Sequence, residues 1–287
     1  MKKITAKVVG FVLAALSVFS LASCNQKSDY LVGKDYVVAP SQLDALMKLD
    51  KGEADVAVID SVMAGYYTST GDYASKMQIV DGLVFAEESY GIAGKKGNQA
   101  LMSKINEALI DIRTEDYTDL VTKYNLTSSV ALTESTTNPY ANATDNSWTE
   151  VVESGKLVIG YTVFAPIAYE ENNKLIGFDI ELAEKTVAYL NTKYNVNLEA
   201  DFVEIDWSTK EAKLEDGTLD LVWNGMTITE ERSAQMCISV PYLFNKQVAV
   251  ILKSDASKYT SKESMSKAIM TAETGSAGET VIVGDKK

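Results

Sequence analysis

Short apolar segments with the composition of strands alternate with segments of helical periodicity along most of this chain. Alternation of this kind favours helices packed on a largely parallel sheet, because parallel strands need a crossover segment, usually a helix, between them. We therefore expect an α/β protein. The predicted strands are 35–39, 54–59, 78–85, 89–93, 157–161, 197–204, 219–223 and 247–253, and the main predicted helices are 42–51, 61–67, 99–114, 117–124, 178–189 and 208–215.

The first 24 residues have the pattern of an export signal. Lys2 and Lys3 precede an apolar core at 8–21, and Leu-Ala-Ser-Cys at 21–24 resembles the lipobox of bacterial lipoproteins. We expect 1–23 to be a lipoprotein signal peptide, Cys24 to carry the lipid and 24–29 to be a tether. An ordinary secretory signal with a chance cysteine is the alternative. No later run reaches the roughly 18 apolar residues that a membrane span needs.

Composition excludes several classes of function. The sequence contains no histidine, which removes Ser-His-Asp and Cys-His catalysis and the usual zinc ligand sets. Beyond Cys24 the only cysteine is Cys237, so neither a disulfide framework nor a cysteine-based metal site is expected. A net charge of -13 without a basic cluster argues against nucleic acid as a partner. We expect a protein without cofactor or metal.

The segment 127–147 differs from the rest of the chain. It is rich in Ser, Thr and Asn and has few large apolar residues. Such a composition is typical of a polar linker.

Two segments repeat one pattern of helix, glycine, acidic turn and strand. The segment 48–60 passes through Gly52 and reaches Asp60 eight residues later, and 213–225 passes through Gly217 and reaches Gly225 at the same spacing. Ligands of open α/β sheets bind just beyond the carboxyl ends of strands. Asp60 and Gly225 are therefore candidates for opposite walls of a cleft. Two unrelated turns, with Asp60 capping the helix that follows, remain the alternative.

The stretch 221–232 combines a strand, a glycine and an arginine. We expect the strand to end at Trp223, where Asn224 and Gly225 break it, and Thr227 or Thr229 to cap a short helix. Arg232 does not suit the first turn of a helix, where exposed N–H groups carry partial positive charge, so an anion site is one interpretation. A simple pair with Glu230 or Glu231, or a solvated side chain, is the other.

Several motifs together resemble the amino-acid-binding proteins of bacterial ABC importers, which have the type II periplasmic-binding-protein fold. They stand at 160–166 (GYTVFAP), 177–183 (GFDIELA), 205–207 (IDW), 223–232 (WNGMTITEER), 239–242 (SVPY), 275–278 (GSAG), 52–60 (GEADVAVID) and 90–93 (YGIA). The resemblance covers nearly all of the chain after the signal except the linker. It implies two α/β lobes joined by two hinge strands and closing over a ligand.

The order of these motifs differs from the family's order, in which the segment like 148–253 comes first and the segments like 30–126 come last. We therefore predict a circular permutation, with the linker 127–147 joining what are ordinarily the two termini. The larger lobe is expected to comprise 89–126 and 148–253, and the smaller lobe 30–88 and 254–287. Hinge crossings are expected near Tyr90 and Lys253.

The resemblance also assigns the ligand contacts. An amino acid offers a carboxylate, which Arg232 would bind with the Thr227, Ser276 and Ala277 amides, and an ammonium, which Asp60 would accept. The Gly225 carbonyl and Thr227 hydroxyl would complete the ammonium site. Phe164 and Trp207 would flank the ligand side chain, with Trp223 and Tyr67 as possible neighbours. No acidic residue matches the family's position for a basic side chain, which weighs against arginine or lysine.

The function implied is capture of a polar amino acid outside the cytoplasm and its delivery to an ABC permease. The partners expected are a free amino acid, the permease and the membrane, reached through lipid on Cys24, and the protein is expected to be a monomer and not an enzyme. A ligand-sensing lipoprotein without transport, or a dehydratase on the same fold, are the alternatives.

Overall fold

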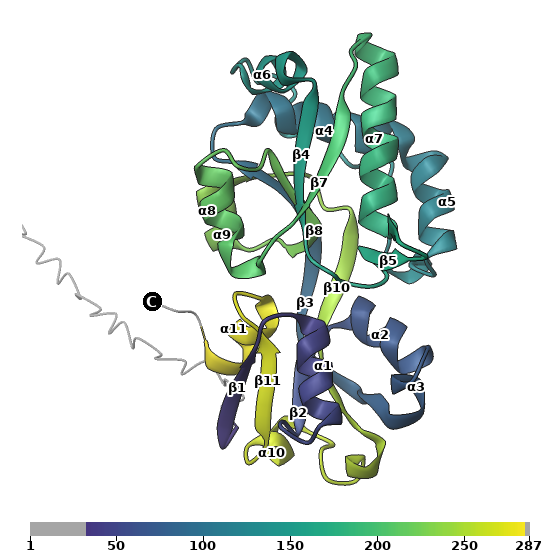
Figure 1. Ribbon diagram of the computed structural model, residues 1–287, viewed down its shortest axis with the longest axis vertical. Helices are drawn as coiled ribbons and strands as arrows, with labels where there is room; N and C mark the ends of the chain where they lie inside the picture. Colours follow the sequence, from purple (N-terminus) through teal and green to yellow (C-terminus); the bar gives the residue numbers. More distant parts are fainter. Residues whose placement is uncertain (1–32, 285–287) are drawn as a thin grey trace, which may run out of the picture.

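The computed structural model describes residues 33–284, which form two α/β lobes stacked along the long axis of the molecule (Figure 1). One sheet runs through both lobes in the order β1-β11-β2-β10-β3-β8-β4-β7, with β9 paired to β3. The mixed α/β class is thus confirmed. The predicted signal peptide, the lipidation site Cys24 and the tether 24–29 lie outside the described residues. Within residues 33–284 no helix combines the length and the apolar composition needed to cross a bilayer.

The large lobe, the upper one in Figure 1, holds the middle of the chain. Its strands are β4 (Lys156–Tyr161), β7 (Glu199–Glu204), β8 (Leu221–Thr227) and β9 (Met236–Ile238), with a hairpin of β5 (Tyr169–Glu171) and β6 (Lys174–Ile176). Its helices are α4 (Gln99–Asp111), α5 (Asp116–Lys123), α6 (Ser147–Ser154), α7 (Phe178–Tyr194), α8 (Lys210–Glu215) and α9 (Glu230–Gln235). Short 3₁₀ turns occur at Ile112–Thr114, Thr127–Ser129 and Trp207–Thr209.

The small lobe is built from both ends of the described chain. Its strands are β1 (Asp35–Ala39), β2 (Val56–Asp60) and β11 (Ile269–Glu273), and its helices are α1 (Gln42–Asp50), α2 (Ser61–Ser69), α3 (Tyr73–Lys76), α10 (Lys262–Met265) and α11 (Ala277–Val283). A 3₁₀ turn at Lys253–Asp255 precedes α10. The predicted cap of α1 is present, since the Ser41 side chain accepts a hydrogen bond from the Asp44 N–H.

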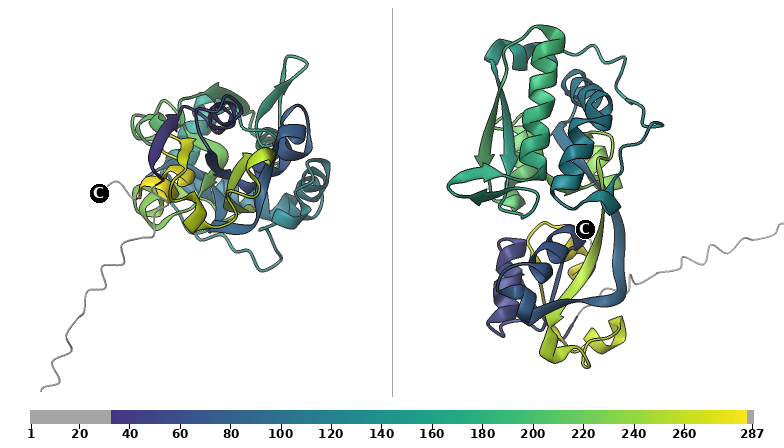
Figure 2. Two further views of the ribbon diagram at one scale, coloured as in Figure 1. Left: turned by 90° about the horizontal axis from the view of Figure 1, so that it is seen from below. Right: turned by 90° about the vertical axis from the view of Figure 1, so that its right-hand side faces the viewer.

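Two long antiparallel strands, β3 (Met77–Lys95) and β10 (Leu243–Leu252), connect the lobes (Figure 2). The segments predicted as separate strands at 78–85 and 89–93 are therefore parts of one strand. Residues 247–250 of β10 already pair with β2 of the small lobe. The expected lobe boundary near Lys253 is wrong for this reason, and the second crossing lies ahead of Gln247.

The two lobes share one arrangement of three parallel strands. In the large lobe β4 lies between β7 and β8, and in the small lobe β11 lies between β1 and β2. The repeated helix-glycine-strand pattern supplies the third strand in both cases, through α1 and β2 and through α8 and β8. Gly52 and Gly217 both have positive φ, +72° and +78°, as helix-ending turns of this type require.

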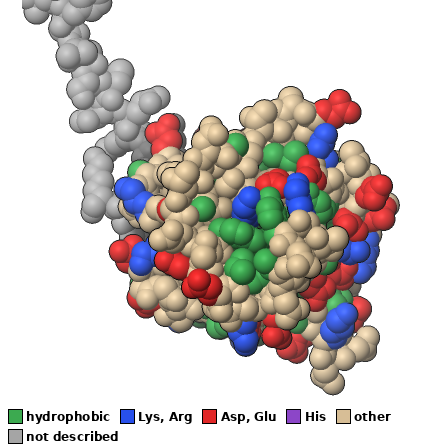
Figure 3. All heavy atoms as spheres, turned by 90° about the horizontal axis from the view of Figure 1, so that it is seen from above, with side chains coloured by type: hydrophobic (Ala, Val, Ile, Leu, Met, Phe, Trp, Pro, Cys, Tyr) green, Lys and Arg blue, Asp and Glu red, His purple; other side chains and the backbone are tan. Residues whose placement is uncertain are grey.

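The segment 127–147 has no α-helix or strand between its 3₁₀ turn at Thr127–Ser129 and Asn146, but it is tied to α4 by hydrogen bonds. Asn138 Nδ2 donates to the Ser103 carbonyl at 2.9 Å, and Asp145 Oδ2 accepts from the Ala100 N–H at 2.8 Å. Helix α6, which begins at the last residue of this segment, was not predicted. It packs Trp148 against Tyr194 with ring centroids 5.5 Å apart. At this end of the large lobe apolar side chains gather near the centre of the face, and acidic side chains are spread mostly around its rim (Figure 3).

Candidate functional site

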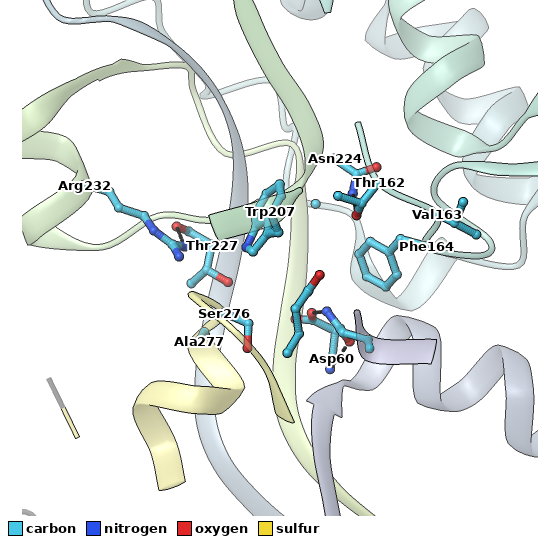
Figure 4. A pocket seen from close by; sticks show the side chains of 13 residues that line it. Asp60, Thr162, Val163, Phe164, Trp207, Asn224, Thr227, Arg232, Ser276 and Ala277 are labelled. Atoms are coloured by element: carbon cyan, nitrogen blue, oxygen red, sulfur yellow. Dashed lines mark hydrogen bonds between the residues drawn. The ribbon is translucent and has the colours of Figure 1, made fainter. Parts of the chain in front are cut away.

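A pocket lies between the lobes, and all eight predicted ligand-contacting residues line it (Figure 4). Phe164, Trp207, Gly225, Thr227 and Arg232 come from the large lobe. Asp60, Ser276 and Ala277 come from the small lobe. The other lining residues are Gln42, Thr162, Val163, Asn224 and Glu273.

Gly225 lies in a bulge of β8 rather than at the predicted strand end. Gly91 pairs with Met226 and Ala93 with Val222, so three residues of β8 oppose the single residue Ile92 of β3. The strand continues to Thr227, and Gly225 adopts φ +60° within it. A side chain would not fit, because a Cβ at Gly225 would approach Phe164 Cε1 to 2.6 Å. The bulge brings the β8 backbone to the pocket.

A buried carboxylate holds this bulge from behind. Asp179, in the first turn of α7, accepts hydrogen bonds through Oδ2 from the Gly225 N–H at 2.8 Å and from the Tyr242 hydroxyl at 2.6 Å. Burial raises the pKa of Asp179 to about 7, although both hydrogen bonds act to lower it. Asp179 therefore fixes the pocket backbone without lining the pocket itself.

Arg232 reaches from its helix into the cleft instead of pairing with its neighbours Glu230 and Glu231. Its guanidinium donates to the Thr227 carbonyl at 2.8 Å and to the Gly275 carbonyl of the small lobe at 3.1 Å. Thr229, the second of the two predicted caps, caps the N-terminus of α9 by accepting a hydrogen bond from the Arg232 N–H at 3.1 Å. A guanidinium has five N–H donors, so these two carbonyls leave it capacity for an anion.

Asp60 stands at the carboxyl end of β2 and is 5% exposed. It occupies the N-cap position of α2, but its side chain makes no capping hydrogen bond. Its carboxylate accepts instead from the side-chain amides of Gln42, Asn245 and Gln247, the last at 2.8 Å. Burial and the nearby charge of Glu88 raise the pKa of Asp60 to about 7. Asp60 is therefore held in place, and a cation beside it would favour its ionised form.

Glu88 of β3 is a second carboxylate behind the pocket that sequence reasoning missed. Its Oε2 accepts from Gln247 Nε2 at 2.9 Å, from Asn245 Nδ2 at 3.1 Å and from the Thr227 hydroxyl at 3.0 Å. Asp60 and Glu88 thus share two amide donors from β10. The Thr227 hydroxyl, expected to contact the ligand, is directed to Glu88 in the structure.

The turn at 275–278 joins β11 to α11. Ser276 caps α11 by accepting from the Glu279 N–H at 3.1 Å, and Glu279 in turn accepts from the Gly275 N–H at 2.8 Å. Gly278 is needed where the helix meets β2, because a Cβ there would come within 2.5 Å of the Val58 carbonyl oxygen. Ser276 and Ala277 are brought to the pocket by this turn.

Two aromatic rings form the upper walls of the pocket, as Figure 4 shows. Phe164 is 4% exposed and packs on Tyr90 with ring centroids 6.4 Å apart, and Trp207 is 5% exposed. Trp223 does not line the pocket. Its side chain is buried in the core against Tyr242, while Tyr67 packs against Tyr66 and Tyr73.

Glu273 is the most consequential pocket residue that the sequence reasoning missed. It is the last residue of β11, so the rule that pointed to Asp60 at the end of β2 would have found it. Asn224 and Thr162 were also missed, although both stand inside the quoted motifs. Their side chains hydrogen-bond to each other at 2.7 Å beside the bulge.

Part of the chain is similar to a known protein family. Residues 157–275 match the model of the bacterial extracellular solute-binding proteins, family 3. The match covers less than half of the chain. The predicted resemblance is thereby confirmed, while the order of segments along the chain is a separate matter.

The relatives share only part of their length with this chain. The probable amino-acid-binding protein YxeM of Bacillus subtilis is 29% identical over 31% of this chain and 32% of its own. Cyclohexadienyl dehydratase of Pseudomonas aeruginosa is 27% identical over 42% of this chain and 44% of its own. The structure of an ABC uptake transporter substrate-binding protein from Streptococcus pneumoniae with bound histidine is 32% identical over 32% of this chain and 35% of its own, with a TM-score of 0.27.

Proposed function

We propose that the protein binds a free α-amino acid in the pocket between its lobes. The observation that carries this proposal is the placement of Arg232 and Asp60, opposite in charge and from different lobes, on one pocket. An α-amino acid presents the complementary pair of charges on neighbouring atoms. The names of relatives agree, since they include an amino-acid-binding protein and an L-cystine-binding protein.

Each end of the ligand has a charge-matched partner. Arg232 binds the carboxylate with two parallel N–H donors, helped by backbone amides of Thr227, Ser276 and Ala277. Asp60 accepts from the ammonium, with the Gly225 carbonyl and Thr227 hydroxyl as further acceptors. Phe164 and Trp207 enclose the side chain.

Binding of this kind favours closure of the cleft. Because Arg232 and Asp60 belong to different lobes, a ligand that contacts both binds the closed form better than the open one and shifts the population toward it. The closed form then docks on an ABC permease, and the protein is lipid-anchored outside the cytoplasm through Cys24. Because one of the relatives is a dehydratase, the test also asks whether the bound ligand is recovered chemically unchanged.

A thermal-shift screen of the amino acids, followed by calorimetry, tests this proposal. A ligand present at 100 times its Kd stabilises the folded state by about 2.7 kcal/mol, which raises Tm by several degrees. We expect at least one amino acid to do so and to be recovered unchanged. The absence of a shift with every amino acid would contradict the proposal, and conversion of a prephenate-like compound would favour a dehydratase.

We also propose that the chain is a circular permutation of the family's order. The shared strand arrangement supports it: β4, β7 and β8 follow each other in the chain, whereas the equivalent β11, β1 and β2 are split between its two ends. Joining the end of α11 to the start of β1 would restore the same strand-helix-strand order. The two elements lie side by side in Figure 1.

A rearranged gene tests the permutation. The rearranged chain starts at the α6 segment, continues through α11 into β1 by a flexible linker, and ends after α5. We expect it to fold and to bind the same amino acid within about threefold of the original affinity. The irregular segment before α6 would be omitted. A rearranged chain that folds but has lost binding would count against equivalence of the two orders.

A further inference from the structure

Glu273 is a buried acidic side chain of the pocket. The proposed contacts of Arg232 and Asp60 with the ligand's carboxylate and ammonium give it no role. It ends β11 opposite Ala39 of β1, lines the pocket with Asp60 and is 4% exposed. Its side chain hydrogen-bonds to Gln42, which also donates to Asp60. A buried carboxylate without a counter-charge is costly, so its presence on a pocket wall calls for a partner.

The charges on the pocket wall do not balance for a ligand of zero net charge. Among the lining residues Arg232 carries +1, while Asp60 and Glu273 each carry −1 when ionised. The carboxylate of an amino acid neutralises Arg232, and its ammonium neutralises Asp60. Glu273 then remains alone, and a ligand with one further positive charge would complete the balance.

Lys210 is a protein cation whose charge acts on Glu273, but its ammonium is engaged by other groups. Its Nζ donates to the Trp207 carbonyl at 3.2 Å and to the Gly275 carbonyl at 3.3 Å, and it pairs with Glu211 at 3.0 Å. Within residues 33–284 none of the ion pairs includes Glu273, although the charge of Lys210 is felt there. The Lys210 ammonium is thus paired with Glu211 and not with Glu273.

The groups around Glu273 are otherwise mostly acidic. Asp60 faces it from β2, with Glu88 of β3 behind, Asp206 precedes Trp207, and Glu279 of α11 holds the adjoining turn. On the remaining sides Gln42 of α1 hydrogen-bonds to Glu273, the Tyr36 hydroxyl of β1 donates to the preceding carbonyl, that of Ala272, at 3.3 Å, and Arg232 is bound to carbonyls. Burial, and then the charge of Asp60, raise the pKa of Glu273 to about 8. A cation in the pocket would reverse this effect and favour the ionised carboxylate.

The aromatic walls suit the same kind of ligand. Trp207 and Phe164 offer flat apolar faces to an extended aliphatic stem, and aromatic rings attract a cationic head. Lys210 Nζ already lies 4.7 Å from the centroid of the Trp207 ring, which shows that a cation is accommodated against this ring.

We propose that the ligand is an α-amino acid with a cationic side chain, such as arginine or lysine, and that Glu273 is the counter-charge of that side chain. This proposal rests on the proposed function and refines it. It departs from the expectation from sequence, which found no acidic residue matching the family's position for a basic side chain. The structure supplies one from a different place, the end of β11.

Calorimetry with arginine and citrulline at pH 8.5 tests the proposal, because the two ligands have nearly the same shape and differ in side-chain charge. We expect the protein to bind arginine about 100-fold more tightly than citrulline, in line with the cost of leaving a buried charge unpaired. In Glu273→Gln we expect this preference to fall below about fivefold, with citrulline affinity little changed. Glu230→Gln, which removes an exposed acid at the first residue of α9, is the control and should keep the preference.

The outcomes distinguish a failure of this proposal from a failure of the proposed function on which it rests. Citrulline or glutamine binding to the unaltered protein as tightly as arginine would overturn the assignment of a cationic side chain, and this comparison needs no variant. An arginine preference that survives in a folded Glu273→Gln protein would overturn the role of Glu273. If no amino acid binds at all, it is the proposed function itself that fails.

Discussion

Arg232→Ala is expected to weaken amino-acid binding by about 100-fold or more while the protein stays folded. Truncating one partner of a desolvated charge pair costs about 2–5 kcal/mol, and each 1.4 kcal/mol is a factor of ten in Kd. The fold should survive, because Arg232 lies in a short helix at the cleft and donates to carbonyls that water can reach once the side chain is gone. Calorimetry gives the affinity, and thermal unfolding of the unliganded protein checks the fold.

The choice of ligand makes this test specific for the carboxylate. The unaltered protein should prefer an amino acid to its carboxamide, which lacks the negative charge, and Arg232→Ala should lose most of that preference. Arg232→Lys should retain an intermediate affinity, because lysine keeps the charge but not the paired donors. Lys185→Ala removes a positive charge on the outer face of α7, where Lys185 pairs with Asp116 at 2.8 Å, and should bind normally. Unchanged affinity in Arg232→Ala would refute the carboxylate assignment.

The sequence was a good guide to the elements and a poorer guide to where they end. Strand–helix alternation gave the α/β class, and most predicted helices lie within a few residues of the observed ones. The long strand β3 was divided because Glu87 and Glu88 interrupt its apolar pattern. Those residues lie where the strand passes between the lobes, outside either core, so no apolar pattern is imposed on them. Helix α6 was missed because it directly follows a polar segment.

The site could be predicted where it lies at strand ends and not where it depends on pairing between distant strands. Asp60 and Gly225 follow from repeated local patterns. Glu88, Asn245 and Gln247 come from the crossing strands β3 and β10, and only the register of these strands against β2 brings them to Asp60. That register is a tertiary property that one sequence does not reveal. Glu273 was within reach of the strand-end rule, but attention went to the glycine turn that follows it.

Asp60→Ala is the second change for which we expect a loss of about 100-fold or more in affinity. The carboxylate that would accept the ligand ammonium is removed, and Glu88 cannot replace it, since its Oε2 is occupied by Gln247, Asn245 and Thr227. The variant also leaves the amides of Gln42, Asn245 and Gln247 without their Asp60 acceptor. A loss of stability from these buried donors is opposed by removal of a buried charge whose pKa is raised to about 7.

The effect on binding is separated from the effect on stability by the α-hydroxy acid that corresponds to the best ligand. This analogue keeps the carboxylate and side chain but lacks the ammonium. The unaltered protein should bind the amino acid far more tightly than the analogue, and Asp60→Ala should bind both with similar, low affinity. Asp72→Ala, an acidic-to-alanine change at the exposed start of α3, serves as the matched control. A folded Asp60→Ala protein that still discriminates between the two ligands would place the ammonium site elsewhere, with Glu273 of the pocket lining as the carboxylate to examine. The two variants together test the closure of the cleft. If Asp60→Ala no longer distinguishes ligands by their ammonium and Arg232→Ala no longer distinguishes them by their carboxylate, the two lobes hold opposite ends of one ligand. Ligand-driven closure requires this arrangement.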